Sequence, residues 1–410
     1  MPTRSSAPIR HIVGCMTGTS LDGLDVALVQ IRGSGLAMSA SLIHHHSISL
    51  VPLAASLRKF AEGVESSPLD YITAARALGR LHVQAVKELC DAVDWRTLPA
   101  PSAKVKNKAT NQNRPDFIVA HGQTIWHAPS AANEDSKNTE SLSWQLFDPW
   151  PLVRELGVPV CYDLRQADLI AGGQGAPITP IADWVMYRNS SQTKSAKPRV
   201  IVNLGGICNI TVVTDDVTQT IGRDVCPCNI LLDGAVQRLY PWQPFDEDGR
   251  IALSGKVIPM LQQAIVIDLW KQLESQRSLG REQFPMSLLD QWVATAKKYE
   301  KHEDIVASYV AAVSDLIVAG ICRATKGMES FDVILAGGGA KNPALLAAIA
   351  RNDQAKFTCL RTDELGIAAE AREAMAFAVL GALSQDGVPI TLPAVTGATN
   401  PGKAGAWVYP

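Results

Sequence analysis

Two segments, about half a chain apart in this 410-residue sequence, follow the same pattern of an apolar strand, a turn containing glycine and a second strand. The first joins Ile12–Val13 to Asp25–Ile31, and the second joins Arg199–Asn203 to Asn209–Val213. Further strand signals alternate with helical ones, for example the apolar helical spacing between Tyr71 and Val93. This alternation predicts an α/β fold, and the repeated opening indicates a duplicated domain.

The length of the chain supports the same division, because 410 residues exceed what one hydrophobic core normally serves. We expect an N-terminal lobe over 1–190, which is joined by the C-terminal segment 375–410, and a C-terminal lobe over 199–374. The polar segment before Pro198, rich in Ser, Gln, Thr and Lys, predicts a surface loop between them.

Composition excludes several classes of partner. Apolar residues make up 47% of the chain and charged residues 19%, with a net charge of −2 and no basic stripe. These values are typical of a soluble globular protein and do not favour binding to nucleic acid or to an anionic membrane. Met1–Val13 lacks the apolar run of a secretory signal, and Ile305–Cys322 contains polar residues that favour a buried helix. Eight scattered cysteines favour reduced thiols and a cytoplasmic location.

The first candidate for chemistry is the glycine-flanked turn after Val13. Gly18, Thr19 and Ser20 supply backbone N–H groups and hydroxyls that would hold phosphate oxygens, and Asp22 would hold a metal ion or a sugar hydroxyl. The same residue types also favour an ordinary hairpin turn, so both interpretations stay open here.

Two more glycine turns are candidates for nucleotide binding. Gly337, Gly338 and Gly339 follow an apolar strand and lead through Asn342 into a helix, an arrangement that seats phosphates near a helix N-terminus. No Gly-Lys-Ser/Thr follows, so this is not a Walker loop. Gly205 and Gly206 form the turn of the second repeat. Tight strand turns are the alternative for all of these glycines.

Asp224 is the candidate general base, because its carboxylate precedes a turn that leads into a predicted helix. Cys226 and Cys228 follow it as a Cys-x-Cys pair. No second cysteine or histidine pair lies nearby in sequence, so a metal or disulfide role is disfavoured. His44–His46 lies in a predicted strand, where a structural role is favoured.

Eleven motifs together, in this order, are similar to one family. The anchors are Met16–Asp25, His121–Trp126, Asp163–Arg165 with Asp168, Ala171–Pro177, Asn203–Asn209, Phe245–Gly249 with Ser254–Lys256, Gly280–Glu282, Gly337–Pro343, Thr362–Glu364, Arg372–Ala374 and Leu392–Ala398. About nine-tenths of the chain resembles the anhydro-N-acetylmuramic acid kinases and their fungal relatives, the levoglucosan kinases.

The resemblance implies the duplicated, ribonuclease H-like fold of actin, the heat-shock-70 chaperones and hexokinase, with two lobes around a cleft. It also implies ATP and Mg²⁺ as cofactors. In such a kinase a carboxylate takes a proton from water, which attacks the anomeric carbon of a 1,6-anhydro ring. The released 6-oxygen then attacks the γ-phosphate of ATP.

Carried onto this sequence, the resemblance makes Asp224 the base, with Arg165 as second catalytic residue. The implied sugar-binding residues are Asp22, His121, Gln123, Thr124, Asp163 and Arg165. The implied nucleotide-binding residues are Gly18, Thr19, Ser20, Gly205, Gly206, Gly337, Gly338, Gly339 and Asn342. The implied metal ligands are Asp22, Asp224 and Glu373.

The chain departs from the family pattern beside the base, where Cys226 and Cys228 replace glycines. A Cβ at a position that needs a positive φ costs on the order of 1–2 kcal/mol, and it can also block a phosphate. A weakened relative that only binds sugar or nucleotide is therefore an alternative, and an actin-like or chaperone-like ATPase is a second one. The sugar is anhydro-N-acetylmuramic acid or levoglucosan, and polar insertions of fungal type favour the latter. A homodimer is expected from the resemblance alone.

Overall fold

The computed structural model describes residues 7–18, 21, 23–101, 113–129, 140–188, 197–275, 286–297, 301–352, 354 and 357–410. It divides into two compact units, one made of Met1–Tyr187 with Glu370–Pro410 and the other of Arg188–Ala369. The return to unit 1 begins at Glu370, whereas the sequence placed it at residue 375. The reason is that α12 (Ala371–Gln385) packs on the sheet of unit 1.

Unit 1 is built on a sheet with the strand order β13-β7-β4-β1-β2-β3. Its strands are β1 (Ile9–Thr17), β2 (Gly23–Arg32), β3 (Ser39–Ser49), β4 (Phe117–Ala120), β7 (Val160–Tyr162) and β13 (Ala406–Val408). The first three pair antiparallel, whereas β1, β4 and β7 run parallel to one another. A separate hairpin joins β5 (Gln123–Ala128) and β6 (Leu142–Leu146).

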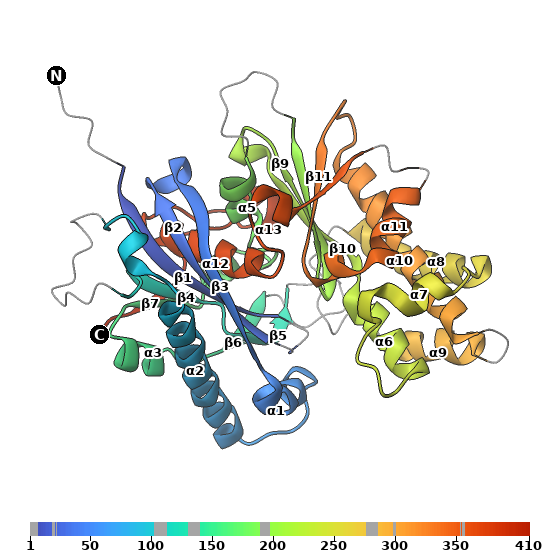
Figure 1. Cartoon of the computed structure of the whole chain (residues 1–410), viewed down its shortest axis with the longest axis horizontal. Coiled ribbons are helices and arrows are strands. Elements are labelled where there is room, and N and C mark those ends of the chain that lie inside the picture. The colour runs from blue at the N-terminus through green and yellow to red at the C-terminus, as the bar shows by residue number, and fades with distance from the viewer. Residues whose placement is uncertain are drawn as a thin grey trace. The chain divides into compact units, whose positions relative to one another are not determined.

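Unit 2 repeats this plan with the strand order β10-β9-β8-β11-β12 (Figure 1). Its strands are β8 (Arg199–Leu204), β9 (Ile207–Val213), β10 (Ile221–Pro227), β11 (Asp332–Ala336) and β12 (Cys359–Arg361). β8, β9 and β10 pair antiparallel with one another in sequence. β11 runs parallel to β8, and β12 runs parallel to β11. The shared strand order confirms the predicted duplication and the ribonuclease H-like α/β fold.

The structure corrects the expected boundary of the first strand. Gly14 to Thr17 was predicted to be turn, but β1 runs on through Thr17. Gly14 is needed there for packing, because a Cβ on it would lie 1.9 Å from the carbonyl oxygen of Ala374 in α12. The missing side chain lets the helix backbone lie directly on the strand.

The sheet of unit 1 lies between helices. Alternate residues of β1 face opposite sides, so Val13 and Cys15 join a core with Leu78 of α2, while Gly14 faces α12. The helices of this unit are α1 (Val51–Ala61), α2 (Pro68–Asp91), α3 (Trp150–Leu156), α4 (Gln166–Ile170), α5 (Pro180–Tyr187), α12 and α13 (Pro393–Thr396). Ser67 caps α2 through a reciprocal hydrogen-bond pair with Asp70, which fixes where that helix begins.

Unit 2 buries its own core around α10 (His302–Ala324). This helix is long and apolar enough to cross a membrane, but 78% of its most apolar window is buried inside the fold, as in the core helix of a soluble protein. The prediction of a buried helix over Ile305–Cys322 is thus confirmed. The other helices are α6 (Asn229–Leu239), α7 (Arg250–Ser254), α8 (Pro259–Ser275), α9 (Met286–Ala296) and α11 (Pro343–Arg351).

Candidate active site

In unit 1, the turn after β1 is tied to the segment after β4. The Thr17 hydroxyl donates to the carbonyl of Gly122 at 2.8 Å, and the His121 N–H donates to the carbonyl of Cys15 at 3.1 Å. The two segments therefore leave the sheet side by side. Gly18 follows β1 directly, whereas Thr19, Ser20 and Asp22 lie outside the described residues, so their phosphate, sugar and metal roles stay predictions.

Arg165 follows β7 and is held by two neutral groups. Its Nε and Nη2 donate to Nε2 of His121 at 3.3 and 3.0 Å, and its Nη1 donates to the carbonyl of Gly175 at 2.6 Å. Hydrogen bonds from a charged donor in a fixed fork are stronger than neutral ones, so these contacts fix the direction of the guanidinium. The structure thus brings together two of the predicted sugar-binding residues, His121 and Arg165.

Both histidines near Arg165 are neutral. Burial and the charge of Arg165 hold the pKa of His121 well below its usual value. The same two causes lower the pKa of His127, on β5, to about 3. Because Nε2 of His121 accepts from Arg165, its proton resides on Nδ1.

Gln123 and Thr124 open β5, next to His121. Gln123 is buried, and the hydroxyl of Thr124 accepts from the Gln145 side chain at 3.2 Å. Asp163 has a φ of 55°, which is rare outside glycine and costs of order 1–3 kcal/mol. Burial raises the pKa of Asp163, although a hydrogen bond with Gln166 works against this. A strained, half-buried carboxylate beside Arg165 is typical of a functional position.

In unit 2, the Gly205–Gly206 turn joins β8 to β9 and supports the start of α6. The carbonyl of Gly206 accepts from the N–H of Cys228 at 2.8 Å and of Ile230 at 3.2 Å, and that of Gly205 from Asn229 at 3.0 Å. These amides are the unsatisfied donors of a helix N-terminus. The two glycines therefore hold α6 in place with their carbonyls, while their own N–H groups stay the predicted phosphate donors.

The Gly337–Gly339 segment passes close to the end of β8. Gly337 has a φ of 80°, and a Cβ on it would lie 2.6 Å from Oδ1 of Asn203. A Cβ on Gly339 would lie 2.8 Å from that of Leu204. Asn342 caps α11, since its Oδ1 accepts from the N–H groups of Ala344 and Leu345 at 3.0 and 3.2 Å. The predicted nucleotide ligand Asn342 thus has a structural role on that oxygen.

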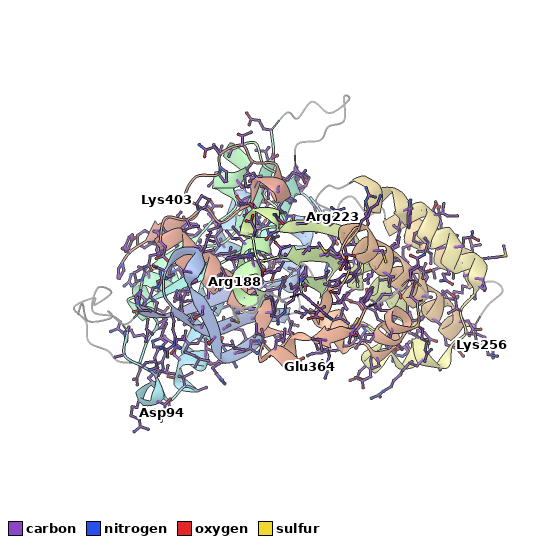
Figure 2. All side chains as sticks on the ribbon, turned by 90° about the horizontal axis from the view of Figure 1, so that it is seen from above. Asp94, Arg188, Arg223, Lys256, Glu364 and Lys403 are labelled. Carbon is purple, nitrogen blue, oxygen red and sulfur yellow. The ribbon has the colours of Figure 1, made fainter. Side chains whose placement is uncertain are left out.

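Asp224 lies in the same register row as these turns. In β10 it pairs with Asn209 of β9, which pairs with Asn203 of β8, and Asn203 pairs with Ala336 of β11. β10, β8 and β11 all run in the same direction, and this row lies next to the carboxyl ends of β8 and β11, whereas β10 continues for three residues beyond Asp224. The preceding residue, Arg223, is labelled in Figure 2. Unit 2 therefore has the predicted base on the register row that leads into both glycine turns.

Cys226 and Cys228, beside Asp224, do not have the backbone strain that a positive φ would cause. Neither has a positive φ, and Cys228 has a φ of −119°. Both side chains are fully buried in the core of unit 2, where Cys208 is the register partner of Cys226. Burial raises the pKa of Cys228 to about 12 and that of Cys226 well above its usual value. Both are therefore protonated residues of the core.

The predicted metal ligands belong to different parts of the chain. Glu373 lies in the first turn of α12 in unit 1, and Asp224 lies on β10 in unit 2. Asp22 is outside the described residues, among which no group of three or more His, Cys, Asp or Glu could hold a metal ion. The three-carboxylate set therefore stays a prediction.

Asp168 and Thr396 are two residues to which the sequence alone assigned no role. Both are buried, and their side chains hydrogen-bond at 2.7 Å although they lie 228 residues apart. Each belongs to one of the eleven motifs, which was the available signal. The motifs alone did not reveal that they meet.

This chain is similar in sequence to known proteins of one family over almost its whole length. The family model for anhydro-N-acetylmuramic acid kinase matches residues 10–410. The anhydro-N-acetylmuramic acid kinase of Bacillus thuringiensis (strain Al Hakam) is 30% identical over 409 residues, with 98% of this chain and 99% of that protein covered. That of Bacillus cereus (strain Q1) is 31% identical over 409 residues, with the same coverage.

Solved structures give weaker likenesses. Component A of (R)-2-hydroxyglutaryl-CoA dehydratase from Acidaminococcus fermentans has a TM-score of 0.42 and 11% identity, covering 92% of this chain and 99% of that one. A ROK family glucokinase from Streptomyces griseus, in complex with glucose and AMPPNP, has a TM-score of 0.36 and 10% identity, covering 90% and 98%. Such scores carry no argument about this chain, so its fold rests on the strand order. The match over residues 10–410, together with relatives that align along their whole length, shows that the chain belongs to the anhydro-N-acetylmuramic acid kinase family.

Proposed function

We propose that this protein is an ATP-dependent kinase that opens the 1,6-anhydro ring of a small sugar and phosphorylates the released 6-oxygen. The observation that carries the proposal is the family match over residues 10–410, which spans both repeats and all the motif residues named above. Anhydro-N-acetylmuramic acid is the proposed substrate, because it names the family. Levoglucosan is the second sugar to test.

Asp224 would act as the general base. Its carboxylate takes a proton from water, the water oxygen bonds to the anomeric carbon, and the bond from that carbon to the 6-oxygen breaks. The 6-oxygen then bonds to the γ-phosphorus as ADP leaves. The position of Asp224 on the register row that leads into the Gly205 and Gly337 turns supports this role, since ligands of open α/β sheets bind at the carboxyl edge where those turns lie.

Arg165 would hold a sugar hydroxyl or the transferring phosphoryl group. Its permanent charge suits either partner, and its contacts with His121 and Gly175 orient it. Because His121 is neutral, it supports the guanidinium instead of repelling it. Gln123, Thr124 and Asp163 would complete the sugar side, together with Asp22.

The glycine turns would hold ATP. Gly18, Gly205 and Gly337 each end a strand, where the backbone is open to phosphates. The carboxylates of Asp22, Asp224 and Glu373 are the donor type that Mg²⁺ prefers, so the residues present fit that ion. When bound, Mg²⁺ would neutralise charge on the phosphates. We further propose a cytoplasmic homodimer, in keeping with the expectation from sequence.

A coupled ADP-release assay on the purified chain tests the proposal. Mg-ATP is combined with anhydro-N-acetylmuramic acid or with levoglucosan, each at high concentration. Sugar-dependent ADP release with a 6-phosphate product supports the kinase and identifies its sugar. ATP binding without release for either sugar would instead favour a relative that binds but does not catalyse.

Replacing the base gives a sharper test. We expect Asp224→Asn to lower turnover by at least about 10²-fold while ATP still binds, because the amide cannot take the proton. Asp215→Asn is the matched control, since Asp215 is an exposed aspartate of the same unit with no assigned role. If Asp224→Asn kept the turnover of the wild type, Asp224 would not be the base.

A further inference from the structure

The C-terminal segment Leu392–Ala398 lies against the glycine-rich loop Ala171–Gly175 of unit 1. The N–H of Gln174 donates to the carbonyl of Thr396 at 2.9 Å, and the N–H of Thr399 donates to that of Ala171 at 3.0 Å. Both segments are family motifs to which no role has been given above. Their contact means that the end of the chain shapes the loop that follows Arg165.

Asp168 is the centre of this contact. Its Oδ1 accepts from the Thr396 hydroxyl at 2.7 Å, and its Oδ2 accepts from the N–H of Gly175 at 2.8 Å. The side chains of both Asp168 and Thr396 are about 1% exposed. A buried carboxylate needs such donors, because without them its desolvation is not offset.

The backbone of the loop packs directly against the carboxylate of Asp168. A Cβ on Gly173 would lie 2.2 Å from Oδ2 of Asp168, so only glycine fits there. Gly175 has a φ of 71°, which favours glycine, and a Cβ on it would lie 2.7 Å from Cδ2 of Leu169. The conformation of the loop is therefore set by how Asp168 is held.

Gly175 links Asp168 to Arg165 through its two backbone groups. Its N–H is fixed by Asp168, and its carbonyl accepts from Nη1 of Arg165 at 2.6 Å. The other side of the guanidinium rests on His121. One continuous series of hydrogen bonds thus runs from Thr396 through Asp168 and Gly175 to the charged group of Arg165.

We propose that Thr396 and Asp168 are positioning residues, which set the direction of the Arg165 guanidinium through the carbonyl of Gly175. This rests on the proposed function, in which Arg165 holds the reacting groups. Misplacement of a catalytic group by about 1 Å can cost on the order of 10²-fold in rate. Loss of the Thr396 hydroxyl therefore has a kinetic effect although Thr396 itself touches no substrate.

The test uses variants that differ by one hydroxyl. Thr396→Val removes it and keeps the shape, Thr396→Ala is a second variant without it, and Thr396→Ser keeps it. Thr325→Val is the matched control, because the buried Thr325 hydroxyl of unit 2 donates to the carbonyl of Ile321 at 2.8 Å. We expect kcat to fall about 10- to 100-fold in Thr396→Val, with KM for ATP unchanged and with Thr396→Ser and Thr325→Val near the wild type.

A double-mutant cycle separates positioning from general destabilisation. In an Arg165→Lys background, which lacks the fork that reaches both Gly175 and His121, Thr396→Val should lower kcat by less than 2- to 3-fold. Its effect on the melting temperature should be the same in both backgrounds. Full multiplicative loss of kcat in the double variant would overturn the proposal.

A second readout needs no activity. Nitrogen NMR of the His121 ring reports whether Nε2 still accepts from Arg165, with His121→Gln used for assignment. Thr396→Val should shift the Nε2 resonance in the same direction as Arg165→Lys, and Thr325→Val should leave it in place. An unmoved resonance overturns the positioning role. Failure of the wild type to phosphorylate either sugar overturns the proposed function and leaves this readout to decide the positioning.

Discussion

The buried ion pair of unit 1 gives a prediction whose size follows from the structure. Arg372, in the first turn of α12, contacts both carboxylate oxygens of Asp183 on α5. Their side chains are 1% and 0% exposed. The Nε and Nη1 atoms of Arg372 are buried without a hydrogen-bond partner among the described residues. The guanidinium therefore depends heavily on Asp183.

Asp183→Asn leaves this charge buried and uncompensated. Removing one partner of a buried pair costs about 3–5 kcal/mol, because the remaining charge keeps its desolvation penalty. In a unit of this size, that corresponds to a fall in melting temperature of roughly 6–20 °C. Removing both charges with Asp183→Leu and Arg372→Met should cost much less than the single change, since neither member then needs a partner.

Calorimetry measures this in the full chain, where the two units need not unfold together. Asp290→Asn is the control, because Asp290 is 60% exposed in its ion pair with Arg238 and such pairs contribute about 0–1 kcal/mol. A loss in Asp183→Asn no larger than in Asp290→Asn would refute the reasoning. So would a double variant that is less stable than the single one.

Two further predictions concern buried groups. Cys226→Gly should lower the free energy of unfolding by about 1–2 kcal/mol, because it leaves a cavity in the core, and thermal melting measures this. The ADP-release assay should show no gain in turnover. A tenfold gain in turnover would mean that the cysteine obstructs the site. His82 is fully buried, and burial lowers its pKa to about 4, opposed by its hydrogen bond with Leu78. The folded state thus binds fewer protons than the unfolded state below pH 6.5, so stability falls by about 3 kcal/mol as the pH drops from 6.5 to 4. His82→Gln should make the melting temperature depend less steeply on pH over this range, although His121 and His127 still contribute to the slope, and an unchanged slope would contradict the assignment.

Much of the fold could be predicted from sequence because its signals are local. The helical spacing between Tyr71 and Val93 corresponds to α2. The repeated strand–turn–strand pattern gave the duplication, since each sheet begins with such a pair. The prediction of a turn at Gly14 was wrong, because the glycine there allows a helix backbone to pack on the strand. Only the three-dimensional contact distinguishes these two uses of glycine.

The sequence predicted which residues belong to the candidate site but not where their side chains point. Periodicity does not show which way Cys226 points, because the register shifts between Asp224 and Cys226, and Cys228 lies beyond the strand at the start of α6. The pairing of Asp168 with Thr396 was likewise out of reach. It joins two short segments from opposite ends of unit 1, and no local pattern encodes such a contact.

The two repeats place their candidate residues at equivalent positions. In unit 1, Gly18 follows β1, His121 follows β4 and Asp163 follows β7. In unit 2, Gly205 follows β8 and Gly337 follows β11, the strands that correspond to β1 and β4 in the shared order. We therefore expect ligands to bind at the carboxyl edge of each sheet, as in other open α/β sheets. Both edges carry a glycine turn and a carboxylate, Gly18 and Asp163 in unit 1 and Gly205 and Asp224 in unit 2, and unit 1 adds the guanidinium of Arg165, which is oriented by the neutral ring of His121.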